Sequence, residues 1–268
     1  MRVGETIRTG GILLRNLAWG GNVASLSLLT KPGRMAQYLS ESLFLYKAIG
    51  SRRGIPQKNV FEVLPCANME AIKLGNLVAD HNFFGEVSSY TADLINLCLI
   101  CQTIKPKVVF EIGTMKGYTA LHFALNSPPD AKVYTLDLPK DKTFHPKLKT
   151  TLVDDSHIPM HASADRTCFE GTEEAGKITT LFGDSATFDY SSFHGKVDFF
   201  FIDGAHSYDY VRSDTLNALQ CCHKGSVLAW HDFGRVGVNG VTRWILEFSK
   251  GREIYSIPGG TLAFTLVK

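Results

Sequence analysis

The chain has 268 residues, of which 44% are hydrophobic and 20% are charged, and these fractions are ordinary for a globular protein. The length suits one domain with appendages and is large enough for a well-buried core. A formal net charge of +2 favours no class of partner, and without a basic cluster a nucleic-acid partner is not expected.

The first part of the chain carries few functional signals. Residues 1–34 are punctuated by glycine and predict irregular structure, whereas 35–49 and 68–78 have the apolar spacing of helices. The apolar stretch 12–29 is interrupted by Arg15 and by glycines and asparagines, so neither a membrane span nor a signal peptide is expected. We expect residues 1–87 to form a helical or irregular extension that shapes an acceptor site or a homo-oligomer interface.

Beyond this extension, short apolar runs alternate with helical patterns. A helix is expected over Tyr90–Ile104, ending before Pro106. The alternation that follows predicts an α/β fold with a doubly wound, mostly parallel sheet. The expected strands are Val108–Ile112, Val133–Leu136, Ile178–Phe182, Val197–Ile202, Ser226–Trp230, Glu253–Ile257 and Thr261–Val267. A tight turn at Pro258-Gly259-Gly260 joins the last two strands, so the final strand should run antiparallel.

A long connection separates the second and third strands. We expect its crossover helix over Ser163–Ala175 and its remainder along the acceptor site. His157 and His161 have the four-residue spacing of metal ligands, but Pro159 argues against a helix that presents both. They are therefore expected to be solvated loop histidines.

The chain is organised around Val108–Thr119, which reads as a buried strand, a glycine turn and the first turns of a helix. Gly113 and Gly117 let the backbone approach a ligand where a Cβ would collide. The free N–H groups of the helix start complete a cradle that includes Thr114 and Tyr118.

The cradle departs from a dinucleotide fingerprint in one informative way. Glu111 stands where that fingerprint has its first glycine, and a carboxylate there would repel a diphosphate. It would suit a ligand that lacks phosphates and carries an ammonium group, such as S-adenosylmethionine (SAM). Asp137 ends the next strand, where an acidic residue can accept hydrogen bonds from a ribose diol. Glycine turns alone are weak signals, and Glu111 and Asp137 could be ordinary strand-end carboxylates.

Several motifs follow one another in a family-specific order. They are Glu111-Ile-Gly-Thr-Met-Lys-Gly-Tyr-Thr119, Tyr134-Thr-Leu-Asp137, Gly183-Asp-Ser185, Phe201-Ile-Asp-Gly-Ala-His-Ser-Tyr208 and His231-Asp-Phe233. Together they resemble class I SAM-dependent methyltransferases, most closely the small O-methyltransferase branch related to catechol, macrolide-sugar and cephalosporin-type enzymes. The resemblance covers residues 88–268 and implies a SAM-binding domain with a seven-stranded, Rossmann-like sheet and an antiparallel C-terminal hairpin. It also implies that Asp184 and Ser185 meet the adenine edge.

Three candidate metal ligands lie at the ends of two adjacent expected strands. Asp203 follows one strand, and His231 and Asp232 follow the next, so all three should meet at the carboxyl edge of the sheet. One imidazole and two carboxylates suit Mg²⁺ or Mn²⁺. The resembled branch holds its metal at these positions, usually with carboxylate or amide side chains, and places Asp203 beside SAM. Alternatively, His231 and Asp232 are simple caps of a strand and a turn.

His206 is the candidate general base. In the catechol-type enzymes this position, three residues after the metal aspartate, holds the base. Macrolide-sugar relatives use an aspartate at the position of Ala205, which excludes that arrangement here. An unperturbed pKa of about 6.5 suits the role. The alternative is a structural histidine that bonds the loop backbone.

The sequence thus predicts a SAM-dependent O-methyltransferase that acts on a hydroxyl of a small molecule or sugar, with assistance from a divalent cation. The alternatives are a metal-independent methyltransferase, a nucleotide-dependent oxidoreductase and a non-catalytic SAM-binding protein. Six scattered cysteines, among them Cys98 and Cys101 within one helical pattern, are expected to be buried free thiols. Reduced thiols fit a cytoplasmic protein without stable membrane insertion.

Overall fold

The structure is a computed structural model that describes residues 55–64, 71–75, 87–139, 144–162, 167–235 and 238–268. The side chains of 87–90, 156 and 159–162 also lie outside this description, as do the segments 1–34 and 35–49 interpreted above. Of the expected helix over 68–78, only 71–75 are described, and there the prediction is wrong because they are not helical. The side chain of Asn126 instead bonds both the N–H and the carbonyl of Lys73, at 2.9 and 2.8 Å.

The described chain forms one seven-stranded sheet in the order β3-β2-β1-β4-β5-β7-β6. The strands are β1 Val108–Ile112, β2 Lys132–Asp137, β3 Ile178–Phe182, β4 Val197–Ile202, β5 Cys222–Trp230, β6 Tyr255–Ser256 and β7 Ala263–Leu266. The first five strands are parallel, and β7 runs antiparallel to both β5 and β6. The predicted fold class, including its antiparallel C-terminal hairpin, is confirmed.

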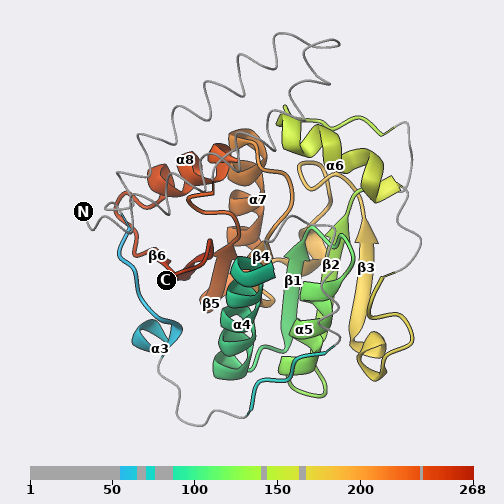
Figure 1. Cartoon of the computed structure of the whole chain (residues 1–268), viewed down its shortest axis with the longest axis vertical. Coiled ribbons are helices and arrows are strands. Elements are labelled where there is room, and N and C mark those ends of the chain that lie inside the picture. Colours follow the sequence, from blue (N-terminus) through green and yellow to red (C-terminus); the bar gives the residue numbers. More distant parts are fainter. Residues whose placement is uncertain (1–54, 65–70, 76–86, 140–143, 163–166, 236–237) are drawn as a thin grey trace.

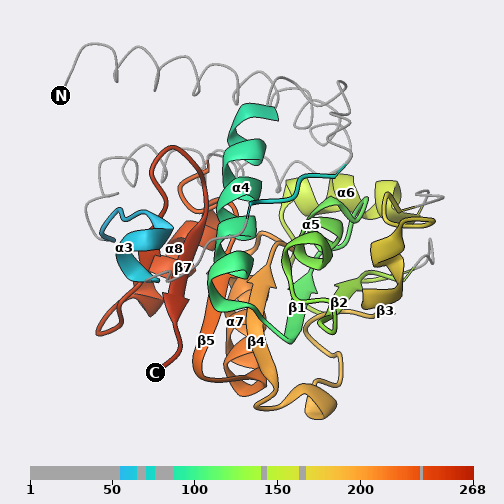
Figure 2. The same ribbon diagram turned by 90° about the horizontal axis from the view of Figure 1, so that it is seen from below.

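Helices separate the strands along the chain. They are α3 Val60–Val63, α4 Val87–Ile104, α5 Tyr118–Asn126, α6 Leu152–Ala162, α7 Tyr208–Cys221 and α8 Asn239–Phe248, with 3-10 helices η2 Glu173–Lys177 and η3 Ser191–Phe193. The expected helix before the first strand is confirmed as α4. In Figures 1 and 2, α4 and α5 cover one face of the sheet, whereas α7 and α8 cover the other.

Strand residues alternate between two hydrophobic cores, as the two-residue period of a strand requires. Val109 and Phe199 pack with α4 and α5, whereas Phe110 and Phe200 pack with α7 and α8. All four of these side chains are completely buried. The central strands are therefore held rigidly from both sides, and the loops at their ends start from fixed positions.

The sheet reverses its strand order between β1 and β4. β1 pairs with β2 on one side and with β4 on the other. In open α/β sheets, ligands bind beyond the carboxyl ends of the strands at such a reversal. Two backbone hydrogen bonds continue the strand pairing past the ends of these strands. Gly113 N donates to Leu136 O at 2.8 Å, and Asp203 N donates to Ile112 O at 2.9 Å.

The connection from β2 to β3 differs from the sequence prediction. Its helix, α6, spans Leu152–Ala162 and includes Pro159, while 167–172 are not helical, so both the expected helix over 163–175 and the loop placement of His157 are wrong. Thr151 begins α6, because its N–H and hydroxyl donate to Asp154 at 2.7 and 2.8 Å while the Asp154 N–H donates back at 3.2 Å. In Figure 1, α6 lies beyond the carboxyl ends of β1, β2 and β3.

Residues before α4 also pack on the sheet. Gln57 forms a parallel bridge with Ser256 of β6, and Ile55 and Val60 are 2% and 1% exposed. Part of the predicted extension over 1–87 therefore contributes to the core, and the domain boundary near residue 88 stays a prediction.

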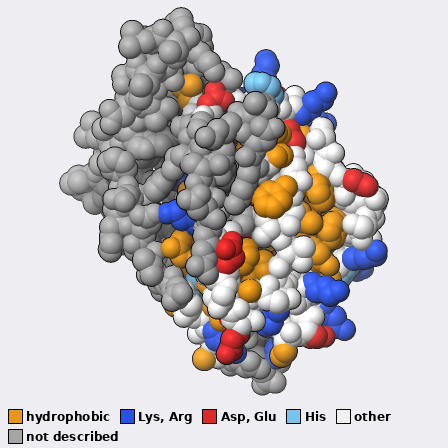
Figure 3. All heavy atoms as spheres, turned by 90° about the vertical axis from the view of Figure 1, so that its right-hand side faces the viewer, with side chains coloured by type: hydrophobic (Ala, Val, Ile, Leu, Met, Phe, Trp, Pro, Cys, Tyr) orange, Lys and Arg blue, Asp and Glu red, His pale blue; other side chains and the backbone are white. Residues whose placement is uncertain are grey.

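The opposite edge of the sheet is β3, which pairs only with β2 among the described strands. Figure 3 faces this side of the molecule and shows hydrophobic side chains gathered among Lys and Arg side chains. Phe182, the last residue of β3, is 53% exposed. No described helix of the chain is long and apolar enough to cross a membrane.

Candidate active site

The glycine turn after β1 forms because two residues adopt backbone angles that favour glycine. Gly113 has φ +102° and Gly117, which precedes α5, has φ +76°. A Cβ on Gly113 would overlap the carbonyl oxygen of Asp203, and a Cβ on Gly117 would overlap the ring of Phe169. Close packing of the turn, rather than ligand approach alone, therefore requires both glycines.

Glu111 is a buried carboxyl group near the end of β1, just before this turn. It is 1% exposed, and its Oε2 accepts a hydrogen bond from the Thr135 hydroxyl at 2.6 Å. The hydroxyls of Thr135 and Thr114 are also 2.6 Å apart. Burial raises the pKa of Glu111 well above its usual range, against the Thr135 hydrogen bond, and nearby Asp203 and Asp137 raise it further. Its Oε1 has no hydrogen-bond partner among the described residues.

Other residues predicted to bind the cofactor also stabilise the loops at the carboxyl edge of the sheet. Asp137 accepts from the N–H groups of Met115 and Leu138, at 3.0 and 2.8 Å, and so ties the glycine turn to β2. Tyr118 is the first residue of α5 and is half-buried.

Asp184 lies in the loop after β3 and is already well bonded. It accepts from the N–H groups of Lys147 and Ala186 and from the Tyr210 hydroxyl, at 2.8, 2.9 and 2.8 Å. The neighbouring Ser185 is 7% exposed. The assigned contacts of both residues with adenine stay predictions, and Asp184 has a clear structural role besides.

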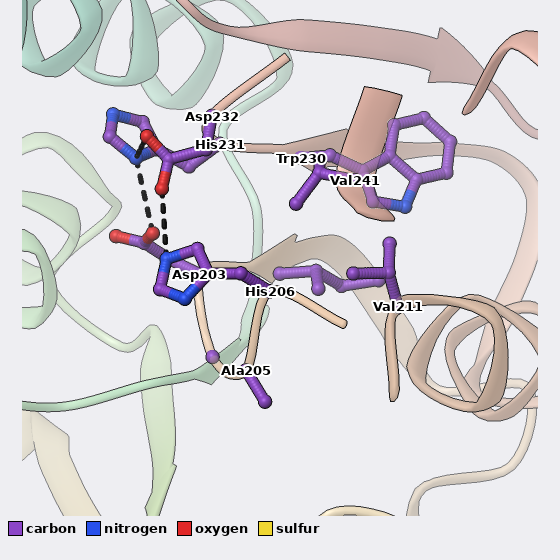
Figure 4. Close-up of a pocket in the computed structure, with 10 residues that line it drawn as sticks. Asp203, Ala205, His206, Val211, Trp230, His231, Asp232 and Val241 are labelled. Carbon is purple, nitrogen blue, oxygen red and sulfur yellow. Dashed lines mark ion pairs between the residues drawn. The ribbon is translucent and has the colours of Figure 1, made fainter. Parts of the chain in front are cut away.

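The predicted metal ligands do come together. Nδ1 of His231 lies 3.1 Å from Oδ1 of Asp203 and 3.2 Å from Oδ1 of Asp232, and Figure 4 shows the three side chains converging. One ligand atom from each lies within 4.8 Å of the others. Neighbouring ligands of an octahedral ion with bonds of about 2.1 Å are about 3.0 Å apart. The spacing and the chemistry of the donors therefore fit a small divalent cation.

His231 is held by carboxylates on both sides of its ring. Besides the contacts of Nδ1, its Nε2 lies 3.4 Å from Oδ2 of Asp93 on α4. Burial alone would lower the pKa of His231, but Asp203 and Asp232 outweigh burial and raise the pKa well above its usual value. The cluster thus carries an excess of negative charge that attracts cations.

Asp232 occupies a strained position at the centre of the cluster. Its φ of +61° is in the left-handed region, which costs a non-glycine residue free energy and is found at functional sites. Its Oδ1 accepts from Nη1 of Arg235 at 2.9 Å, and its Oδ2 lies 2.9 Å from Nε2 of His206. Burial alone would raise the pKa of Asp232, but Arg235 and His231 hold it well below its usual range.

The ring of His206 lies between two carboxylates. Its Nδ1 is 2.6 Å from Oδ1 of Asp154, and its Nε2 faces Asp232. Burial alone would lower the pKa of His206, but the bonds to Asp154 and Asp232 raise it to about 10. A neutral ring, which a general base needs, is therefore not the state this geometry favours, because both ring nitrogens face carboxylate oxygens that accept hydrogen bonds.

A small pocket lies beside these groups. Its polar wall is formed by Asp203, His206, His231 and Asp232. Its apolar wall includes Val211, Trp230 and Val241, as Figure 4 shows. The pocket places an apolar surface next to the candidate metal ligands.

Sequence reasoning missed two residues of the site, Asp93 and Asp154. Asp93 shares the buried face of α4 with Leu97 and Ile100, so a carboxylate at helical spacing on an apolar face was the available signal. Asp154 is the fourth residue of the Thr151-Leu-Val-Asp capping pattern, which also marks the start of α6.

A family model described as a methyltransferase domain matches residues 110–233. That range contains Glu111, Asp203, His231 and Asp232 and runs from β1 to the loop after β5. No curated protein matches the chain.

Several solved structures have a similar fold. Cofactor-bound Rv0187 from MTB is 15% identical, with 91% of this chain and 94% of that chain covered and a TM-score of 0.50. The SAH-bound methyltransferase PaMTH1 from Podospora anserina is 13% identical, with 70% and 84% covered and a TM-score of 0.51. At these identities the likeness confirms the fold alone.

Proposed function

We propose that this chain, whose residues 110–233 match the model of a methyltransferase domain, transfers a methyl group from SAM to a hydroxyl of a small molecule, assisted by a divalent cation. One observation carries the proposal. Asp203 connects the glycine turn with the candidate metal ligands, because its carbonyl packs against Gly113 while its carboxylate contacts His231.

The glycine turn fits the amino-acid end of SAM. Oε1 of Glu111 is a buried acceptor without a described partner, and Asp137 and Asp203 make its surroundings more negative. An ammonium group would satisfy that oxygen and offset the charge, whereas a diphosphate would be repelled. SAM, when bound, supplies a methyl group activated by its positive sulfur.

The cluster of Asp203, His231 and Asp232 would hold the cation. A divalent cation, when bound, lowers the pKa of a hydroxyl that contacts it. The imidazole of His231 favours Mn²⁺ over Mg²⁺, since Mg²⁺ prefers oxygen ligands. The protein's contribution is to place the acceptor oxygen beside the methyl donor, and holding two reactants in line accounts for much of such a rate.

His206 stays a predicted residue of this site, but we assign its ring a holding role. Each ring nitrogen faces a carboxylate, so accepting a proton from the substrate would require breaking one of these contacts. Catechols, sugar hydroxyls and polyketide hydroxyls are the acceptor classes that the sequence resemblance leaves open.

The cytoplasm is the proposed location. The described cysteines, including Cys98 and Cys101 on α4, are free thiols. Burial raises the pKa of Cys98 to about 12, which disfavours the reactive thiolate form.

The test is formation of the demethylated product, SAH, from SAM in the presence of catechol, sugar and polyketide hydroxyl acceptors with Mn²⁺ or Mg²⁺. We expect turnover with at least one acceptor class, loss of turnover in excess chelator, and loss in Asp203→Asn. Full turnover in chelator would support the metal-independent alternative. Binding of NAD in a titration would support the oxidoreductase alternative, and SAM binding without SAH formation would support a non-catalytic protein.

A further inference from the structure

We propose that Asp154 of α6 is a positioning residue for Asp232 and acts through the ring of His206. The inference rests on the proposed function, because it concerns how the candidate metal ligand Asp232 is held. It brings a helix that none of the sequence motifs includes into the site.

The first step is the contact of Asp154 with the loop after β4. Oδ1 of Asp154 accepts from the backbone N–H of His206 at 3.0 Å and lies 2.6 Å from Nδ1 of its ring. One oxygen therefore fixes both the backbone and the ring plane of His206. Asp154 is 5% exposed, so water does not compete strongly for these bonds.

The second step is that the two carboxylate oxygens of Asp232 have different partners. Oδ2 lies 2.9 Å from Nε2 of His206, whereas Oδ1 faces Nδ1 of His231 at 3.2 Å and accepts from Nη1 of Arg235 at 2.9 Å. With Oδ2 held by the ring, only Oδ1 is directed into the cluster. Asp232 would thereby hold a cation through Oδ1 rather than through both oxygens.

The third step is the anchoring of Asp154 itself. Its Oδ2 accepts from the N–H and the hydroxyl of Thr151 at 2.7 and 2.8 Å. Both residues are buried, Thr151 directly before α6 and Asp154 in its first turn. The chain Thr151–Asp154–His206–Asp232 therefore connects the start of this helix to the cluster.

Mutation of a residue that hydrogen-bonds to a metal ligand and orients it usually lowers metal affinity by about 10- to 100-fold. We expect Asp154→Ala to weaken Mn²⁺ binding by this amount, because His206 loses its anchor and Asp232 can then turn. Asp154→Asn should recover most of the affinity, since its amide oxygen can still accept from His206.

The experiment is a calorimetric titration of Mn²⁺ into the full chain, carried out on the wild type and on each variant. SAH affinity is measured in parallel and should be unchanged, which shows that each variant is folded. Asp155→Ala is the matched control, because its carboxylate lies on the same turn and accepts from the hydroxyl of Thr150 at 2.6 Å. Thr151→Ala removes the hydroxyl bond to Asp154 but keeps the backbone N–H bond, so the Mn²⁺ affinity should stay within a few-fold of wild type.

Wild-type Mn²⁺ affinity in Asp154→Ala would overturn the inference. An equal loss in Asp154→Ala, Asp155→Ala and Thr151→Ala would also overturn it, because helix stability would then explain the effect. A wild-type protein that binds no Mn²⁺ would overturn the metal part of the proposed function, and the inference with it. If Asp154→Ala does not bind SAH, His206→Ala tests the same connection, and wild-type Mn²⁺ affinity in that variant would again contradict the proposal.

Discussion

Oδ2 of Asp93 lies 3.4 Å from Nε2 of His231, so a carboxylate from the helix before β1 contacts the loop after β5. The same carboxylate accepts from the N–H and the hydroxyl of Thr261, and from the N–H of Leu262, at distances of 2.9 to 3.3 Å. Asp93 is therefore a junction between α4, the C-terminal hairpin and the candidate metal cluster.

Asp93→Ala should lower the stability of the whole domain. Asp93 is 1% exposed, and its removal leaves the donors of half-buried Thr261 and buried Leu262 without this acceptor. We expect the free energy of unfolding to fall by roughly 3 kcal/mol in urea denaturation, the usual cost of such groups. Asp130→Ala, at an exposed position before β2, is the control and should change it by less than about 0.5 kcal/mol. A similar small change in Asp93→Ala would contradict the assigned role.

Glu111→Gln should weaken ligand binding while stabilising the free protein. The variant keeps a group that accepts from Thr135 but cannot pair with an ammonium, so SAH affinity should fall roughly 10- to 100-fold, as for a lost hydrogen bond to a charged group. Because the pKa of Glu111 is raised on folding, its burial costs stability as pH rises above about 4.5. Without ligand, the free energy of unfolding of the variant should therefore exceed that of the wild type by more at pH 8 than at pH 5. Unchanged SAH affinity in calorimetry would place the ammonium elsewhere.

A substitution at Gly113 should destabilise the fold as well as weaken ligand binding. Any Cβ there would overlap the Asp203 carbonyl, and the φ of +102° adds strain. We expect Gly113→Ala to lower both the melting temperature and the SAH affinity. Reduced affinity with an unchanged melting temperature would show that the turn has room for a side chain and that the ligand alone requires glycine.

Asp214 should make stability depend on pH. It is fully buried on α7, and burial raises the pKa of its carboxyl to about 7. An unfolded carboxyl titrates near pH 3.9, so the folded protein holds its proton more tightly and the free energy of unfolding falls as pH rises between these values. Asp214→Asn cannot ionise, and its advantage over wild type should grow across this window by no more than about 4 kcal/mol.

The control for Asp214 is Asp209→Asn, at an exposed position in the first turn of the same helix. A difference between Asp214→Asn and wild type that is the same at pH 5 and pH 8 would show that Asp214 titrates normally.

The parts of the fold that were predictable are those with strong local signals. β1, β3 and β4 begin and end as predicted because their apolar runs are bounded by charged residues, glycine or proline. The meeting of Asp203 with His231 followed from a general rule, since parallel strands deliver their carboxyl ends to one edge.

The parts that were not predictable depend on contacts distant in sequence. The connection from Asp154 to His206 spans 52 residues, and neither residue indicates the other. α6 was placed wrongly because Pro159 was read as a helix breaker. There it removes a single hydrogen bond, to the carbonyl of Asp155, while the Thr151 cap and the burial of Leu152 and Val153 favour the helix.

The most direct test of the account is a crystal structure of the protein grown with SAH and Mn²⁺, with an anomalous difference map for the metal. We predict one Mn²⁺ bound by Oδ1 of Asp203, Nδ1 of His231 and Oδ1 of Asp232, with the SAH ammonium beside Glu111. Oδ2 of Asp232 should remain bonded to His206. SAH bound at the glycine turn with no anomalous peak at the three side chains, at saturating Mn²⁺, would contradict metal-assisted methyl transfer at this site.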